Sequence, residues 1–158
     1  MSALASSKNE VLLLLLPGRG EMYALHPAAL TRAQTARRKL SSDYRDALLM
    51  SQDGTIRRID SIDVLGPWGT SLSRRLLSRL TDAWSIKVST SQPITISLDD
   101  LKDLLVRCIQ SQQSVESLLL ETRKDQEQFI DSVKSATSTE DLMGRLRLPS
   151  PEDALDVL

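Results

Sequence analysis

The sequence predicts an α+β fold, in which an antiparallel or mixed sheet of about five strands packs against helices and the last third of the chain is helical. Three observations support this prediction. An apolar run at residues 11–16 is followed by turn residues, Asp53-Gly54 separates two strand-like segments, and the chain beyond residue 97 carries amphipathic helical patterns. Strands that are joined by tight turns favour an antiparallel or mixed sheet with helices on one face.

The domain organisation follows from length and composition. A chain of 158 residues is expected to form one domain rather than two. Residues 1–9 are small and polar, so they are expected to be disordered. Residues 10–158 then form the single α+β domain, with a sheet-and-helix body at 10–97 and a helical cover at 98–158.

Charge is unevenly distributed along the chain, although the net charge is only −1. Residues 17–87 carry 12 basic and 7 acidic side chains, whereas residues 88–158 carry 7 basic and 13 acidic ones. Such asymmetry is typical either of an interaction surface or of two halves that attract each other within one fold. The second interpretation is favoured, because neither half contains a dense run of like charge.

The first predicted element is a hairpin. Val11–Leu16 is apolar at every position, which is typical of a central strand buried on both faces. The segment 17–20 (Pro-Gly-Arg-Gly) has turn chemistry because glycine accepts positive φ freely, and Met22–Leu25 is expected to return as the second strand. A phosphate-binding loop is not expected here, since no third glycine, Gly-Lys-Ser/Thr motif or following helix completes that pattern.

A helix is predicted next, over Ala28–Leu40. Pro27 suits the first turn of a helix. Alanine and leucine recur on one narrow face, while Arg32, Arg38 and Lys39 fall away from it. The helix is therefore expected to pack on the sheet through small side chains.

A second hairpin is predicted around Asp53-Gly54, a strong turn signal between the segments Ala47–Gln52 and Thr55–Leu65. The apolar positions of the second segment change parity along its length. This change predicts a β-bulge, or burial on both faces near the end of the strand.

An amphipathic helix is predicted over Leu72–Ala83, after a break at residues 66–69 (Gly-Pro-Trp-Gly) and a cap at Thr70 or Ser71. Apolar side chains cover one side of this helix: Leu72, Leu76, Leu77, Leu80 and Ala83. Three arginines mark its opposite, outer face: Arg74, Arg75 and Arg79.

The rest of the chain is expected to hold one half-buried strand and then helices. Residues 84–88 alternate apolar and polar side chains, and Ile94 and Ile96 extend that strand or form a short partner. Ser97 and Asp100 resemble a capping box, which predicts a helix after them. Further helical segments are predicted at about 115–136, around 142–146 and, as a last turn, at 153–158. The short tail 149–158 is expected to dock on its own body.

No catalytic, cofactor-binding or metal-binding residue is predicted. His26 and Cys108 lie 82 positions apart, which does not provide the ligand spacing of a metal site. Cys108 falls on the apolar face of a predicted helix and His26 precedes a proline, so both are interpreted as structural. The acidic residues near positions 60 and 100 are interpreted as solvated charge.

Basic residues and one tryptophan are the candidates for an interaction surface. If the faces that carry them converge, they form a positive surface that suits nucleic acid or another anion. A solvated face neutralised by the acidic last third is favoured over this, because the pI is about 5.8 and aromatic residues for base stacking are few. A tryptophan at a break is more often buried than a binding anchor. The candidate surface comprises Arg32, Arg38, Arg57, Arg58, Trp68, Arg74, Arg75 and Arg79.

The sequence favours a cytoplasmic protein without membrane contact. The apolar run at 11–16 is too short for a membrane span, which needs about 20 residues, and for a secretion signal. The single cysteine, Cys108, cannot form an intrachain disulfide, which favours a reducing compartment.

Three function classes remain open. The first is a non-enzymatic protein-binding or regulatory module, which self-associates or neutralises a partner as a bacterial immunity or inhibitor protein does. The amphipathic last third and the lack of a chemistry-bearing constellation favour it. The second is a nucleic-acid-binding protein that uses its arginine-rich faces. The third is a small enzyme whose site is assembled from distant residues. No cofactor is expected in any of them.

Overall fold

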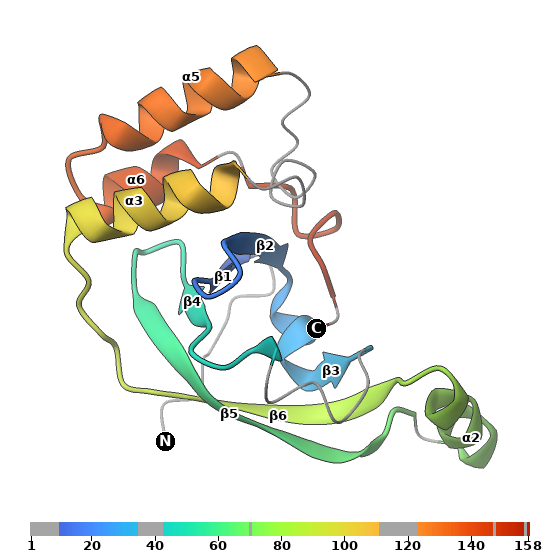
Figure 1. The fold of residues 1–158 in the computed structure, drawn as a ribbon. Coiled ribbons are helices and arrows are strands. Elements are labelled where there is room, and N and C mark those ends of the chain that lie inside the picture. The colour runs from blue at the N-terminus through green and yellow to red at the C-terminus, as the bar shows by residue number, and fades with distance from the viewer. Residues whose placement is uncertain (1–9, 35–42, 70, 111–122, 147, 157) are drawn as a thin grey trace.

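The computed structural model describes residues 10–34, 43–69, 71–110, 123–146, 148–156 and 158. Its strands are β1 (Leu12–Leu16), β2 (Glu21–Leu25), β3 (Arg32–Ala33), β4 (Leu48–Met50), β5 (Ile56–Pro67) and β6 (Trp84–Thr90). They form one curled sheet in the order β2-β1-β4-β5-β6-β3, and every pair is antiparallel (Figure 1). The expected antiparallel sheet is confirmed, with a sixth strand, β3, that the sequence does not predict.

The helices are the 3-10 helix η1 (Pro27–Thr31) and the α-helices α2 (Leu72–Leu80), α3 (Leu98–Ile109), α5 (Arg123–Lys134) and α6 (Thr139–Arg145). Helices α3, α5 and α6 lie together on one side of the molecule, whereas α2 lies far from them (Figure 1). The predicted cap at the start of α3 is present, because Ser97 accepts a hydrogen bond from the backbone of Asp100. Ser138 caps α6 in the same way, by accepting from the backbone of Asp141. Of the helix predicted at 115–136, residues 115–122 lie outside the described residues.

Strand β1 is buried on both faces, as its unbroken apolar run predicts. It lies between β2 and β4 in the sheet, and its five leucines are at most 4% exposed. Because successive side chains of a strand point to opposite faces, Leu13 and Leu15 join one core while Leu12, Leu14 and Leu16 join another. The sheet therefore needs apolar cover on both sides.

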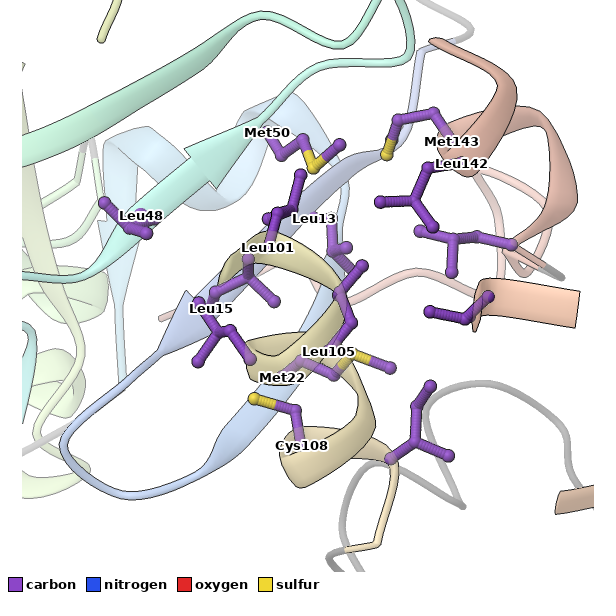
Figure 2. Packing of buried hydrophobic residues seen from close by; sticks show 14 of the residues in the cluster. Leu13, Leu15, Met22, Leu48, Met50, Leu101, Leu105, Cys108, Leu142 and Met143 are labelled. Carbon is purple, nitrogen blue, oxygen red and sulfur yellow. The ribbon is translucent and has the colours of Figure 1, made fainter. Parts of the chain in front are cut away.

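The first core lies between the sheet and the helices α3, α5 and α6. Leu13 and Leu15 of β1 pack with Leu101 and Leu105 of α3, and Leu142 of α6 closes the same cluster (Figure 2). All five side chains are completely buried. Burying each of them stabilises the fold by about 1.5–3 kcal/mol. The C-terminal helices thus complete the core of this face.

The second core lies on the opposite face and is closed by the end of the chain. The last residue, Leu158, packs there against the even-numbered leucines of β1. Leu155 exchanges backbone hydrogen bonds with Ala24 and His26 beside β2, at 2.9 and 2.7 Å, and Leu158 does so with Arg32 and Gln34 beside β3. Strands β2 and β3 are the two edges of the sheet. The tail therefore docks on its own body, as expected, and forms hydrogen bonds at both edges of the sheet.

Two predicted helices are wrong. The helix predicted over Ala28–Leu40 makes only the turn η1, after which Arg32 and Ala33 pair with β6 as an edge strand; residues 35–40 lie outside the described residues. A helix here would have buried little apolar surface, because its apolar face consists mainly of alanine. Pairing with the edge of β6 satisfies the backbone hydrogen bonds of Arg32 and Ala33 instead. The last helical turn predicted at 153–158 is absent, because Leu155 bridges to Leu25 of β2.

Smaller differences concern the ends of elements. Helix α2 ends at Leu80 instead of Ala83, because Asp82 has a positive φ of 52°, which is incompatible with a continuing helix. Ile94 and Ile96 were expected to extend β6 or to form a short partner strand, and Ile94 forms a single antiparallel bridge to Ile56 of β5. The bulge expected in β5 is present, with register shifts between Ile59 and Ser61 and between Val64 and Gly66.

Strand β5 has two different partners along its length. Residues 56–58 pair with β4 in the body, and residues 59–67 pair with β6. Beyond β4, strands β5 and β6 continue as a ribbon whose β6 edge pairs with β3 at residues 84 and 85, and α2 lies at its far end (Figure 1). We call this ribbon and its helix, residues 59–90, the arm, and the other described residues the body.

The two-faced burial of β1 predicts a contrast between two leucines. Leu13→Ala is expected to lower the free energy of unfolding by about 2–5 kcal/mol, because it leaves a cavity at a site that is 0% exposed. Leu80→Ala at the arm is the control: its side chain is 84% exposed, so a change below about 0.5 kcal/mol is expected. Urea unfolding measures both, and equal losses would contradict this assignment of the core.

Candidate interaction surface

Helix α2 is attached to the ribbon by a short, well-defined junction. Pro67 pairs with Trp84, and the backbone N–H of Trp68 donates to the carbonyl oxygen of Ala83 at 3.0 Å. Ser71 caps the helix by accepting a hydrogen bond from the backbone of Arg74. The turn requires glycine at 69, because its φ is +122° and a Cβ there would lie 2.7 Å from the Cβ of Arg74.

The leucines of α2 face solvent. Leu72 is 77% exposed, Leu76 55%, Leu77 60% and Leu80 84%. We call these four side chains the leucine face. Every other side chain of α2 whose burial is described is also exposed. Two further large apolar side chains of the arm, Leu65 and Trp68, are exposed as well, at 67% and 37%.

This exposure changes the interpretation of the amphipathic pattern. An apolar stripe on a helix normally faces the core of its own domain, and the arginine side was expected to be the outer face. In the structure α2 lies at the end of the ribbon, away from both cores, so its leucines have no intramolecular cover among the described residues. The leucine face is the surface that sequence reasoning missed. The available signal was the position of this helix between two strands that pair with each other.

Three of the predicted surface residues lie on the same helix. Arg74, Arg75 and Arg79 are all exposed. Among the described residues none of the three forms an ion pair, and the guanidinium Nε of Arg75 donates to the carbonyl oxygen of Gly69 at 3.2 Å. Helix α2 contains no acidic residue. The leucine face is therefore flanked by arginines that form no ion pair within the described residues.

Arg32 and Trp68 contact each other where α2 joins the ribbon. The guanidinium carbon of Arg32, on the edge strand β3, lies 5.2 Å from the centre of the Trp68 ring. A cation–π contact at an exposed site contributes about 0.5–1 kcal/mol. The contact connects the arm to β3, and it leaves Trp68 37% exposed next to α2.

The other predicted surface residues do not join this group. Arg57 donates to the backbone oxygen of Ser91, and Arg58 forms an ion pair with Asp60 at 3.4 Å. Both arginines lie where β5 pairs with β4, separated from Pro67 by roughly 30 Å of extended chain at 3.3 Å per residue. Arg38 lies outside the described residues.

The single cysteine and the single histidine are both engaged in the fold. Burial raises the pKa of the Cys108 thiol to about 11, and the thiol donates to the backbone oxygen of Glu21. The Nδ1 atom of His26 accepts a hydrogen bond from the backbone of Ala28 and so caps η1. Within the described residues, no group of three or more His, Cys, Asp and Glu side chains is placed to hold a metal ion.

Comparison with known proteins adds no relative. The sequence matches no protein-family model, and neither the curated proteins nor the solved structures show a significant similarity to it. In the part of the chain that the structure describes, no helix has the length and apolar character needed to cross a membrane.

The exposure of the leucine face predicts a difference in thiol reactivity. In the variant Leu76→Cys, one thiol is expected to react rapidly with Ellman's reagent at pH 8, because position 76 is 55% exposed. The native Cys108 is the internal control. It is buried and its pKa is about 11, so its reaction is expected only as fast as the core opens. Slow reaction of both thiols would show that the leucine face is covered.

Proposed function

We propose that the protein is a non-enzymatic binding module that acts through a protein interface, and that the leucine face of α2 is the centre of that interface. The exposure of Leu72, Leu76, Leu77 and Leu80 carries the proposal. Contiguous apolar side chains with a polar rim are typical of interaction sites. The body supplies a stable support, while the arm presents the surface at a distance from it.

The energetics of the helix support the same function. An isolated helix shorter than about 12–15 residues is marginal in water, and helices in proteins gain most of their stability from packing of an apolar face. Helix α2 has nine residues and does not bury its apolar face. Covering one leucine contributes about 1.5–3 kcal/mol. A partner on this face would therefore both bind and stabilise the helix.

A protein partner suits this surface better than nucleic acid does. Nucleic-acid binding depends on basic side chains that follow the phosphate backbone. The arginines of the arm surround an apolar centre, and Arg57 and Arg58 are engaged elsewhere. An apolar core with a charged rim is the anatomy of a protein–protein interface. A regulatory module that occupies a partner's surface, as inhibitor and immunity proteins do, needs no more than this.

The proposal predicts that charge placed on the leucine face abolishes partner capture. The tagged full-length protein is used to retain proteins from a lysate of its native cells, and retained species are identified by mass spectrometry. Leu72→Asp with Leu76→Asp is expected to reduce specific retention at least tenfold, because two carboxylates would enter the apolar centre of the interface.

The control is Lys124→Asp with Gln128→Asp, which places two carboxylates at the same spacing on the exposed side of α5 and changes the net charge by one unit more. This control is expected to retain the wild-type partners. Both double variants should keep a near-native urea midpoint. Unchanged retention by the α2 variant would overturn the proposed role of the leucine face.

A further inference from the structure

We infer that the occupant of the leucine face is an amphipathic helix of a partner protein, with an apolar stripe between acidic flanks. The inference rests on the proposed function, because it names the chemistry of the partner at the same surface. It is carried by the arrangement of leucines and arginines around α2.

The shape of the leucine face favours a helix as its occupant. Leu72, Leu76 and Leu80 are spaced four residues apart and form one ridge along α2. Such ridges fit into the grooves of another helix, which is the commonest mode of helix packing. Leu77 lies beside this ridge and widens it. The outer surface of a single helix at the end of an arm is convex, so an occupant must wrap it with side chains of its own.

The charges around the face favour acidic flanks on that occupant. With 100° per residue, Arg75 and Arg79 border the leucine face on the side of Leu72, and Arg74 borders it on the side of Leu77. Arginines therefore lie along both edges. Since none of them forms an ion pair among the described residues, carboxylates at the rim of a partner would supply complementary charge and favour it over basic helices.

A second copy of the chain fits this surface poorly. Two leucine faces packed together would bring two sets of three arginines into one interface, and α2 offers no carboxylate to either set. The described residues of the acidic side of another copy offer little apolar surface to complement the leucine face. Of the large apolar side chains described there, from residue 91 onward, only Ile94 and Leu155 are exposed, at 36% and 44%. The occupant is therefore expected to be a different protein.

The test uses two fluorescent synthetic peptides that form the same leucine-striped helix, one with glutamate and one with lysine on its flanks. Fluorescence anisotropy measures their binding to the full-length protein. The glutamate peptide is expected to bind at least tenfold more tightly than the lysine peptide at 50 mM NaCl, and this preference is expected to shrink at 500 mM NaCl because salt screens exposed charge.

Two variants separate the apolar and the electrostatic contributions. Arg74→Gln, Arg75→Gln and Arg79→Gln together are expected to weaken binding of the glutamate peptide about tenfold and to leave the lysine peptide no weaker. Leu76→Asp is expected to reduce binding of the glutamate peptide at least tenfold. Both variants change only exposed side chains, and the urea midpoint of each variant verifies its fold.

Several outcomes would overturn the inference. Equal affinity of the two peptides would contradict the proposed acidic flanks. So would an affinity for the glutamate peptide that the triple arginine variant leaves unchanged. If the wild-type protein is a dimer and Leu76→Asp dissociates it, the occupant is a second copy of the chain. If the protein binds neither peptide but sediments with 3:1 phosphatidylcholine–phosphatidylserine vesicles, and Leu76→Asp prevents this, the occupant is a lipid surface. If the peptides do not bind but partner capture from lysate still depends on Leu72 and Leu76, only this inference is wrong. If partner capture is also independent of these leucines, the proposed function is wrong as well.

Discussion

Five consecutive leucines in β1 impose the constraint on which the rest of the structure depends. A strand in the middle of a sheet points its side chains alternately to both faces, so a strand made only of leucine must be covered on both sides. Helices α3, α5 and α6 supply one cover. The other comes from η1, β3, the near part of the arm with Ile59 and Ile86, and the last residue, Leu158. The tail links the two edges of the sheet in this arrangement, because it bonds to both β2 and β3.

The arm follows from the same constraint. Both faces of the sheet are already covered around β1 and β4, so the far part of β5 and β6 continues as a ribbon with α2 at its end. The two cores exclude the leucines of α2. An apolar face held away from its own core is costly for an isolated protein, and it leaves the proposed interface already formed. The Arg32–Trp68 contact connects this surface to the body.

Much of the body could be predicted from local patterns. The leucine run identifies β1 as a central strand, Asp53-Gly54 identifies the turn between β4 and β5, and Ser97 identifies the start of α3. These signals act within a few residues, so their outcome needs little information from the rest of the chain. The helix predicted over Ala28–Leu40 failed for the opposite reason. Its alanine face was weak, and the free edge of β6 offered Arg32 and Ala33 a better set of hydrogen bonds.

Residue order by itself determined that α2 is a helix with leucines on one side and arginines on the other. It did not determine where those leucines point, because periodicity describes a helix and not its surroundings. Only the tertiary structure placed α2 beyond both cores, since the length of β5 and its change of partner from β4 to β6 set that position. The candidate surface therefore changed from scattered arginines to an apolar centre with an arginine rim. The physical reason is that burial is a property of the packed chain, while amphipathicity is a property of the sequence.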